Sequence, residues 1–162
     1  MIAVDTAAEM ASAVGRLAPG ADYVFMAAAV ADFRPVGVAD QKIKKDDGPP
    51  EIRLESTTDI LAELGRTRTP GQVIVGFAAE TTDLRQNAAA KLAAKGADLI
   101  VANDVTSPDT GFDHDTNAVV LLDADGGEAV VPLADKRQVA RAVLDAAIDI
   151  RRRRRAGGGT DS

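Results

Sequence analysis

Three lysines gather in the segment VADQKIKKDDGPPE, which spans residues 38–51. Lys42, Lys44 and Lys45 stand within four positions of one another, in a chain whose formal net charge is −6. Lysine ammonium groups are common ligands of phosphate. Such a cluster in an acidic protein predicts a local anion site, whereas the alternative is a solvated loop that keeps the protein soluble.

Lys91 and Lys95 form a second cationic pair, spaced i, i+4, which a helix would place on one face. Asp32 follows a predicted strand and could hold a divalent cation or the edge of a base. Two groups of lysines and a carboxylate are typical of a site for a polyphosphate with a divalent cation. Each residue also has a simpler interpretation, as an exposed helix face or a turn residue.

The ends of three predicted strands supply the small and polar residues of this site, in the segments AAVADF (28–33), GFAAE (76–80) and ND (103–104). In an open α/β sheet, ligands bind outside the carboxyl ends of the strands. Gly76 and the alanines would let a ligand approach the backbone closely. Neither G-x-x-x-x-G-K-[ST] nor G-x-G-x-x-G occurs, so the predicted phosphate site follows neither motif.

Composition excludes several classes of protein. Residues 1–150 hold 14 Lys and Arg against 24 Asp and Glu, a balance that argues against a general nucleic-acid-binding face. The chain has no cysteine and one histidine, His114, which we interpret as a surface loop residue. The longest apolar run, residues 24–31, is too short to span a bilayer. With no signal-peptide pattern at the start, we expect a soluble cytoplasmic protein without a membrane partner.

Strands and helices are predicted to alternate along the chain. Apolar periodicity and capping signals predict helices over 5–18, 57–65, 83–96 and from 134, and buried strands over 23–30, 72–80 and 98–104. Thr6 with Glu9, and Ser56 with Asp59, fit capping boxes. This alternation predicts a parallel sheet with right-handed crossovers.

Other segments depart from that alternation. Residues 35–50 read as a flap, 52–56 as a short strand leaving it, and 117–133 as a β-hairpin that turns at Gly126-Gly127. The predicted fold is α/β, with a Rossmann-like, mostly parallel sheet, flanking helices, the flap and the late hairpin. We expect one domain over 1–150 and a disordered Arg/Gly-rich tail over 151–162, whose five arginines extend the last helix as a frayed, solvated end.

Five segments in order, AAAVADFRP, KIKK, GFAAET, KLAAKGADLIVAND and GFDHDTNAVVLL, resemble phosphopantothenoylcysteine synthetase. In bacteria this enzyme is the synthetase half of a bifunctional coenzyme A biosynthesis protein, and the resemblance covers nearly all of residues 2–150. It implies a CTP- and Mg²⁺-dependent ligase. Such an enzyme activates the carboxylate of 4′-phosphopantothenate as an acyl-cytidylate, which the amine of cysteine then attacks. The resemblance also implies a homodimer, and the late hairpin is a plausible dimer contact.

The resemblance assigns roles to individual positions. Lys42 matches the catalytic lysine of the family and would also contact the nucleotide. The other implied nucleotide-binding positions are Ala28, Asp32, Gly76, Phe77, Ala78, Lys91 and Lys95. Asp32 is the candidate metal ligand, and Asn103 with Phe112 is assigned to the substrate pocket.

The family opens earlier than this chain, with a Gly-rich strand–loop–helix and a segment resembling N-x-S-S-G-K-M-G. We therefore expect the isolated chain to be weak or inactive, and a decarboxylase partner or a separate chain to supply that segment. Two other functions stay open. One is a noncatalytic nucleotide-binding or assembly module on the same fold. The other is a nicotinamide-dependent oxidoreductase, against which the absence of G-x-G-x-x-G counts.

Overall fold

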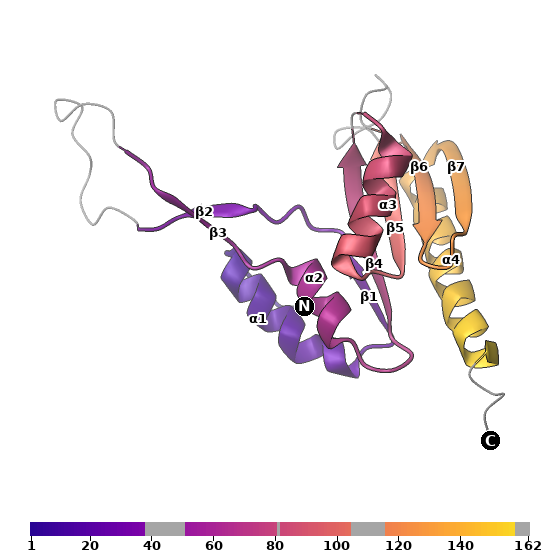
Figure 1. Cartoon of the computed structure of the whole chain (residues 1–162), viewed down its shortest axis with the longest axis horizontal. Coiled ribbons are helices and arrows are strands. Elements are labelled where there is room, and N and C mark those ends of the chain that lie inside the picture. The colour runs from indigo at the N-terminus through magenta and orange to yellow at the C-terminus, as the bar shows by residue number, and fades with distance from the viewer. Residues whose placement is uncertain (38–50, 81, 105–115, 158–162) are drawn as a thin grey trace.

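The computed structural model describes residues 1–37, 51–80, 82–104 and 116–157. A five-stranded sheet forms the body, with helices on both faces, and a two-stranded sheet projects from it (Figure 1). The elements in chain order are α1 (Ala7–Leu17), a 3₁₀ turn (Ala18–Gly20), β1 (Tyr23–Met26), β2 (Phe33–Pro35), β3 (Leu54–Ser56), α2 (Ile60–Thr67), β4 (Val73–Glu80), α3 (Leu84–Lys95), β5 (Leu99–Asp104), β6 (Thr116–Asp123), β7 (Glu128–Asp135) and α4 (Lys136–Gly157).

The main sheet has the strand order β1-β4-β5-β6-β7. β1, β4 and β5 are parallel, with Val75 opposite both Phe25 and Leu99. β6 and β7 are the two strands of the predicted hairpin. β6 pairs antiparallel with β5, so the hairpin belongs to the main sheet and is not a separate arm. The predicted α/β class is therefore confirmed, with a mixed sheet.

Two apolar layers cover the sheet. On one face, side chains of β4, β5 and β6 pack against α4 through Val139, Val143, Ala147 and Ile150. These four residues are the predicted stripe of the last helix, and all are buried. On the other face, α1, α2 and α3 pack over Ile74, Ala78, Ile100 and Ala102. With 3% aromatic residues, this core consists mainly of Ala, Val, Leu and Ile.

β1 differs from its prediction. The apolar run 23–30 predicts a strand buried on both faces, but β1 ends at Met26 and is the end strand of the sheet. Phe25 is 37% exposed for this reason. An apolar run shows that a strand can be buried, not that a neighbour covers it.

The helix ends follow the predicted signals only in part. At α1, both hydrogen bonds of the Thr6–Glu9 capping box are present, which confirms that prediction. At α2, the predicted box of Ser56 with Asp59 is wrong, because Ser56 ends β3 and Asp59 itself is the N-cap. α2 also continues past Gly65 to Thr67, whereas Gly96 ends α3 in the left-handed conformation, as predicted.

The arginine run does not form a disordered tail at 151–157, which is a correction to the predicted boundary. α4 extends through Gly157, and three arginines fix its end to the amino-terminal side of the sheet. Arg151 pairs with Asp22 and lies 5.2 Å over the ring of Tyr23. Arg153 pairs with Asp123 at 2.6 Å. The sequence pattern hid these contacts because the partners are distant in sequence. Residues 158–162 lie outside the described residues.

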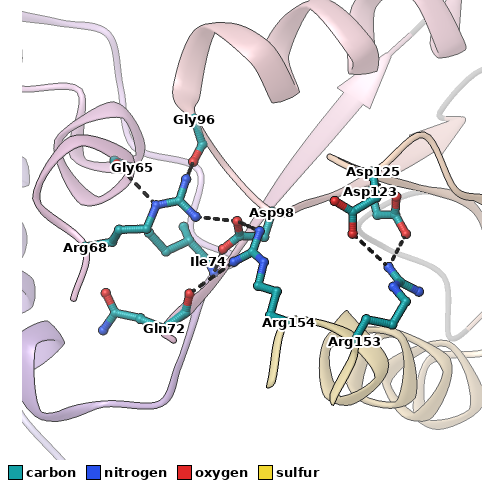
Figure 2. A network of polar contacts seen from close by, with 10 residues as sticks. All are labelled: Gly65, Arg68, Gln72, Ile74, Gly96, Asp98, Asp123, Asp125, Arg153 and Arg154. Atoms are coloured by element: carbon teal, nitrogen blue, oxygen red, sulfur yellow. Dashed lines mark hydrogen bonds and ion pairs between the residues drawn. The ribbon is translucent and has the colours of Figure 1, made fainter. Parts of the chain in front are cut away.

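Asp98 is the centre of the deepest polar network (Figure 2). Its side chain is 1% exposed and accepts hydrogen bonds from Arg68, from Arg154 at 2.5 Å and from the Ile74 N–H at 2.7 Å. A carboxylate this deep requires charged or hydrogen-bonded partners. The network therefore joins α4, β4 and the segment after α2 at the amino-terminal end of the parallel strands.

The sheet formed by β2 and β3 projects away from the body (Figure 1). β3 confirms the short strand predicted over 52–56, and the flap lysines Lys42, Lys44 and Lys45 lie outside the described residues. Among the described residues, no helix combines the length and apolar character that crossing a bilayer requires.

Candidate nucleotide-binding site

A pocket lies where the segment after β1 meets the start of α2 and one face of α3. Its cavity volume is about 150 Å³. Five predicted site residues line it, although they come from three separate segments of the chain: Ala28, Asp32, Phe77, Lys91 and Lys95. The pocket lies at the carboxyl end of β1 and beside Phe77 in the carboxyl half of β4, which is near the position expected of a ligand site in this fold class.

The two lysines of α3 point toward this pocket and are held there by protein groups. The ammonium of Lys91 donates a hydrogen bond of 2.9 Å to the carbonyl of Phe77. Lys95 forms an ion pair with Asp59, the N-cap of α2. The i, i+4 spacing therefore does place both cations at one site, on the side of α3 that faces α2.

Hydrogen bonds fix the segment that carries Asp32. The N–H of Thr57 donates to the carbonyl of Asp32 at 2.9 Å, and the hydroxyl of Thr57 donates to the carbonyl of Ala31. The side chain of Asp32 is exposed at the pocket wall. These bonds set the distance between the carboxylate and the start of α2.

Side chains of both signs line the pocket, two lysines with Asp32 and Asp59, so any excess of positive potential there comes from the start of α2. The first residues of α2 line it, and a helix N-terminus carries free N–H groups and partial positive charge. Burial opposes ionisation of Asp59, but hydrogen bonds from Lys95 and the Ala62 N–H outweigh it and leave the pKa of Asp59 lowered. Asp59 is therefore ionised near neutral pH and offsets part of the cationic charge.

A divalent cation also fits the donor set here. No group of three or more His, Cys, Asp or Glu side chains occurs within the described ranges. Mg²⁺ is commonly held by one or two carboxylates together with phosphates of the substrate and water. Asp32 shares the pocket with Lys91 and Lys95. One carboxylate could hold Mg²⁺ together with the phosphates of a nucleotide, but it could not form a metal site from protein ligands alone.

Gly76 lies below the pocket and does not line it. A Cβ atom at this position would come within 2.6 Å of a Leu61 methyl and 2.8 Å of the Ile100 side chain. The glycine thus allows α2 to pack closely onto β4 and contributes to the site through the position of that helix.

Two further predicted residues, Ala78 and Asn103, line a larger cavity on the α4 side of the sheet, with a volume of about 670 Å³. Ala28 and Phe77 line both cavities. The side-chain oxygen of Asn103 is buried and accepts no hydrogen bond from the described residues. A buried acceptor without a partner is costly, and it is the polar group best placed to meet a ligand there.

Lys42 and Phe112 lie outside the described residues, so their predicted places in the site are not described. The structure adds Asp59 and Thr57, which sequence reasoning did not assign to the site. The capping pattern pointed to Asp59 only as a helix start. Its contact with Lys95 joins residues 36 positions apart and has no local signature.

Comparison with known proteins shows the family of the chain. Residues 1–150 match the model of the DNA/pantothenate metabolism flavoprotein C-terminal domain. The chain belongs to this family. The resemblance to phosphopantothenoylcysteine synthetase, drawn from five motifs, is thereby confirmed at the level of the family.

Individual members of the flavoprotein C-terminal domain family support the same assignment. The coenzyme A biosynthesis bifunctional protein CoaBC of Bacillus subtilis is 46% identical over 143 residues, which are 88% of this chain and 35% of that protein. A crystal structure of the C-terminal domain of CoaBC superposes with a TM-score of 0.71 at 36% identity, covering 90% of this chain and 62% of that one. The chain thus spans about a third of the length of this curated relative.

A more distant structure shares the fold. A Cab2 mutant in complex with phosphopantothenate-cysteine superposes with a TM-score of 0.75 at 18% identity, covering 98% of this chain and 55% of that one. At this identity the likeness concerns the fold alone.

Proposed function

We propose that this chain carries the phosphopantothenate–cysteine ligase function of coenzyme A biosynthesis, with CTP as the cosubstrate. In the first step, a carboxylate oxygen of 4′-phosphopantothenate attacks the α-phosphorus of CTP and pyrophosphate leaves. In the second, the amine of cysteine attacks the acyl carbon of the acyl-cytidylate and CMP leaves with the bonding electron pair. The amine proton is lost to solvent.

The observation that carries this proposal is the convergence of Asp32, Lys91 and Lys95 on one pocket at the carboxyl end of β1. Both the carboxylate of the substrate and the α-phosphate are negative, so Coulomb repulsion opposes the first step. Fixed cations and a helix N-terminus that reduce this repulsion lower the barrier. The family membership of residues 1–150 supports the same reaction class.

Within this proposal, Lys91 and Lys95 bind the phosphates of CTP, and the start of α2 adds its N–H groups. Ala28 and Phe77 border the space for the nucleotide, Ala78 borders the adjoining cavity, and Gly76 acts through the close packing of α2. Asp32 would hold Mg²⁺, which supplies Lewis-acid neutralisation of the phosphate charge when bound. Lys42 is assigned to stabilising charge on the α-phosphate and the acyl intermediate.

Asn103 and Phe112 are assigned to the substrate. The side-chain oxygen of Asn103, which has no partner among the described residues, can accept a hydrogen bond from an amide or hydroxyl of the pantothenate arm. This cavity adjoins the phosphate pocket at Ala28 and Phe77, as a two-substrate reaction requires. The match of residues 1–150 to a pantothenate metabolism domain family supports this choice of substrate class. A homodimer stays a proposal that rests on the family.

Pyrophosphate release tests the proposal. The chain is incubated with Mg²⁺, CTP, 4′-phosphopantothenate and cysteine, beside a Lys42→Gln variant and the B. subtilis relative. We expect release that requires 4′-phosphopantothenate, is slower than that of the relative and is lost in the variant. CTP binding without any release would overturn the ligase assignment and favour a noncatalytic nucleotide-binding module.

A further inference from the structure

A cavity of about 250 Å³ lies between α1 and α2, and the ligase proposal gives it no role. Ala11, Gly15 and Ala18 line it from one side of α1, and their small size keeps the space open. A Cβ atom on Gly15 would meet no neighbouring heavy atom within 4 Å. Because an apolar cavity of about 150 Å³ already binds benzene, this cavity is large enough for a small organic molecule.

Gln72 brings a buried hydrogen-bond acceptor to this cavity. The residue is 3% exposed and lines the cavity wall. Its Nε2 donates to the carbonyls of Ala18 at 2.5 Å and Ala21 at 2.8 Å, which uses both N–H groups and fixes the orientation of the amide. Figure 2 shows this side chain extending away from the Asp98 network.

The remaining oxygen of that amide is available to a ligand. No group within the described part of the chain donates a hydrogen bond to Oε1 of Gln72. A buried acceptor without a donor costs free energy. A ligand that carries an N–H or O–H group would satisfy it.

The charge around the cavity favours a cation. Glu63 is in the lining, and neither lysine nor arginine is among the described residues that line it. The carboxyl-terminal end of α1, which carries partial negative charge, forms part of the same wall. Arg66 pairs with Oε2 of Glu63, but both side chains are exposed, and such a pair contributes little and leaves Oε1 available.

The cavity also adjoins the candidate nucleotide pocket. Thr58 and Ile60 line both spaces. Ile60 is buried and begins α2, the helix whose N-terminus faces the nucleotide pocket. A molecule seated between α1 and α2 therefore contacts the start of the helix that forms the neighbouring site.

We propose that the cavity between α1 and α2 is a binding site for a small organic cation, an amine or amidine on an apolar body. The apolar body packs between Val14 and Leu64, and the cationic group donates to Gln72 and Glu63. Binding shifts the start of α2. The consequence for a nucleotide rests on the proposed function, whereas the binding and the shift are measured without nucleotide.

The test titrates the ¹⁵N-labelled chain with benzylamine, benzyl alcohol and benzoate, which share one ring but differ in charge. We expect benzylamine to bind saturably with a Kd of about 1 mM or below and to shift the amide signals of residues 14–18 and 58–64. Benzyl alcohol should bind at least about threefold more weakly, and benzoate should not saturate. The proposal is overturned if benzylamine does not saturate by about 20 mM, if benzoate binds as tightly, or if the shifted amides lie elsewhere.

Matched substitutions locate the site. Gly15→Leu fills the cavity, whereas Ser12→Leu adds the same side chain at an exposed position of α1 outside the lining. We expect Gly15→Leu to weaken benzylamine binding by about tenfold or more and Ser12→Leu to leave it unchanged. Equal effects of the two variants would place the site elsewhere.

Glu63→Gln gives a second variant that does not depend on how α1 accepts leucine, because Glu63 is exposed. It removes the charge and keeps the shape of the side chain. Benzylamine should bind about threefold or more weakly, with benzyl alcohol unaffected. Unchanged benzylamine affinity in this variant would refute the role of the carboxylate and the choice of a cation.

Discussion

Lys95 and Asp59 form an ion pair across the candidate site, and the same Asp59 caps α2 by accepting the Ala62 N–H at 3.0 Å. One oxygen of this carboxylate thus orders the helix, and the other neutralises a lysine that faces the pocket. Since Lys95 can pair with only a few oxygens at once, a phosphate that binds there competes with Asp59.

Asp59→Asn tests this competition. Asparagine caps a helix about as well as aspartate, so α2 should persist while the negative charge is removed. We expect the affinity for Mg·CTP to rise about threefold, which corresponds to less than 1 kcal/mol, as measured by isothermal titration calorimetry. Asp59→Ala is the control for the cap and should lower stability by about 1 kcal/mol. Weaker CTP binding by Asp59→Asn at unchanged melting temperature would show instead that Asp59 positions Lys95.

Acid sensitivity of α1 follows from its capping box. The carboxylate of Glu9 accepts the N–H of Asp5 at 2.7 Å and of Thr6 at 3.2 Å, and these bonds lower the pKa of Glu9 below its ordinary value of 4.5. A lowered folded-state pKa contributes stability above pH 4.5, and that contribution disappears as the pH falls through the folded value.

Glu9→Gln removes this titration. Urea unfolding from pH 7 to pH 3 should show wild type more stable than the variant at neutral pH, with the difference vanishing at the acid end. A difference that is constant with pH would contradict the assignment.

The buried network at Asp98 should dominate the electrostatic contribution to folding. Asp98→Asn leaves Arg68 and Arg154 without their shared carboxylate. Because both arginines are about a third exposed and can be hydrated, we expect a loss of about 1–3 kcal/mol, the range for hydrogen bonds to charged groups. Asp149→Asn removes an exposed ion pair to Arg152, at 3.3 Å, and should cost between about 0 and 1 kcal/mol. Chemical denaturation of both variants checks the contrast, and similar losses would refute it.

Glycine substitutions test how closely α2 approaches the end of α3. A Cβ atom on Gly65 would collide with the carbonyl oxygen of Lys95, so Gly65→Ala forces the helices apart and should destabilise the protein by about 1–3 kcal/mol. Gly15 in α1 has open space around it, and Gly15→Ala should stabilise by about 0.5–1 kcal/mol. The melting temperatures of the two variants should therefore shift in opposite directions.

Local patterns were enough to predict much of the fold. The stripe from Val139 to Ile150 identified the buried face of α4, and Thr6 with Glu9 identified the start of α1. Both are signals between residues a few positions apart. The candidate site was also partly predictable, because Asp32, Lys91 and Lys95 follow strand ends or share a helix face, which topology then brings together.

What the sequence hid depends on distant contacts. Arg154 reaches Asp98 across 56 positions, so a run of arginines that resembles a solvated helix end instead anchors α4. The exposure of Phe25 follows from the place of β1 at the end of the sheet. Residues a few positions apart in the sequence indicate neither which distant side chain an arginine pairs with nor the order of the strands in the sheet.

The binding of CTP in the presence of Mg²⁺ tests the central claim most directly. Titration calorimetry would compare wild type with Lys91→Met, Lys95→Met and the control Arg66→Met, an exposed arginine in the last turn of α2. We predict that each lysine variant weakens CTP binding by about tenfold while the control does not. Equal affinity in all four proteins, or tighter binding of NADH than of CTP, would contradict the assignment of this pocket to the nucleotide.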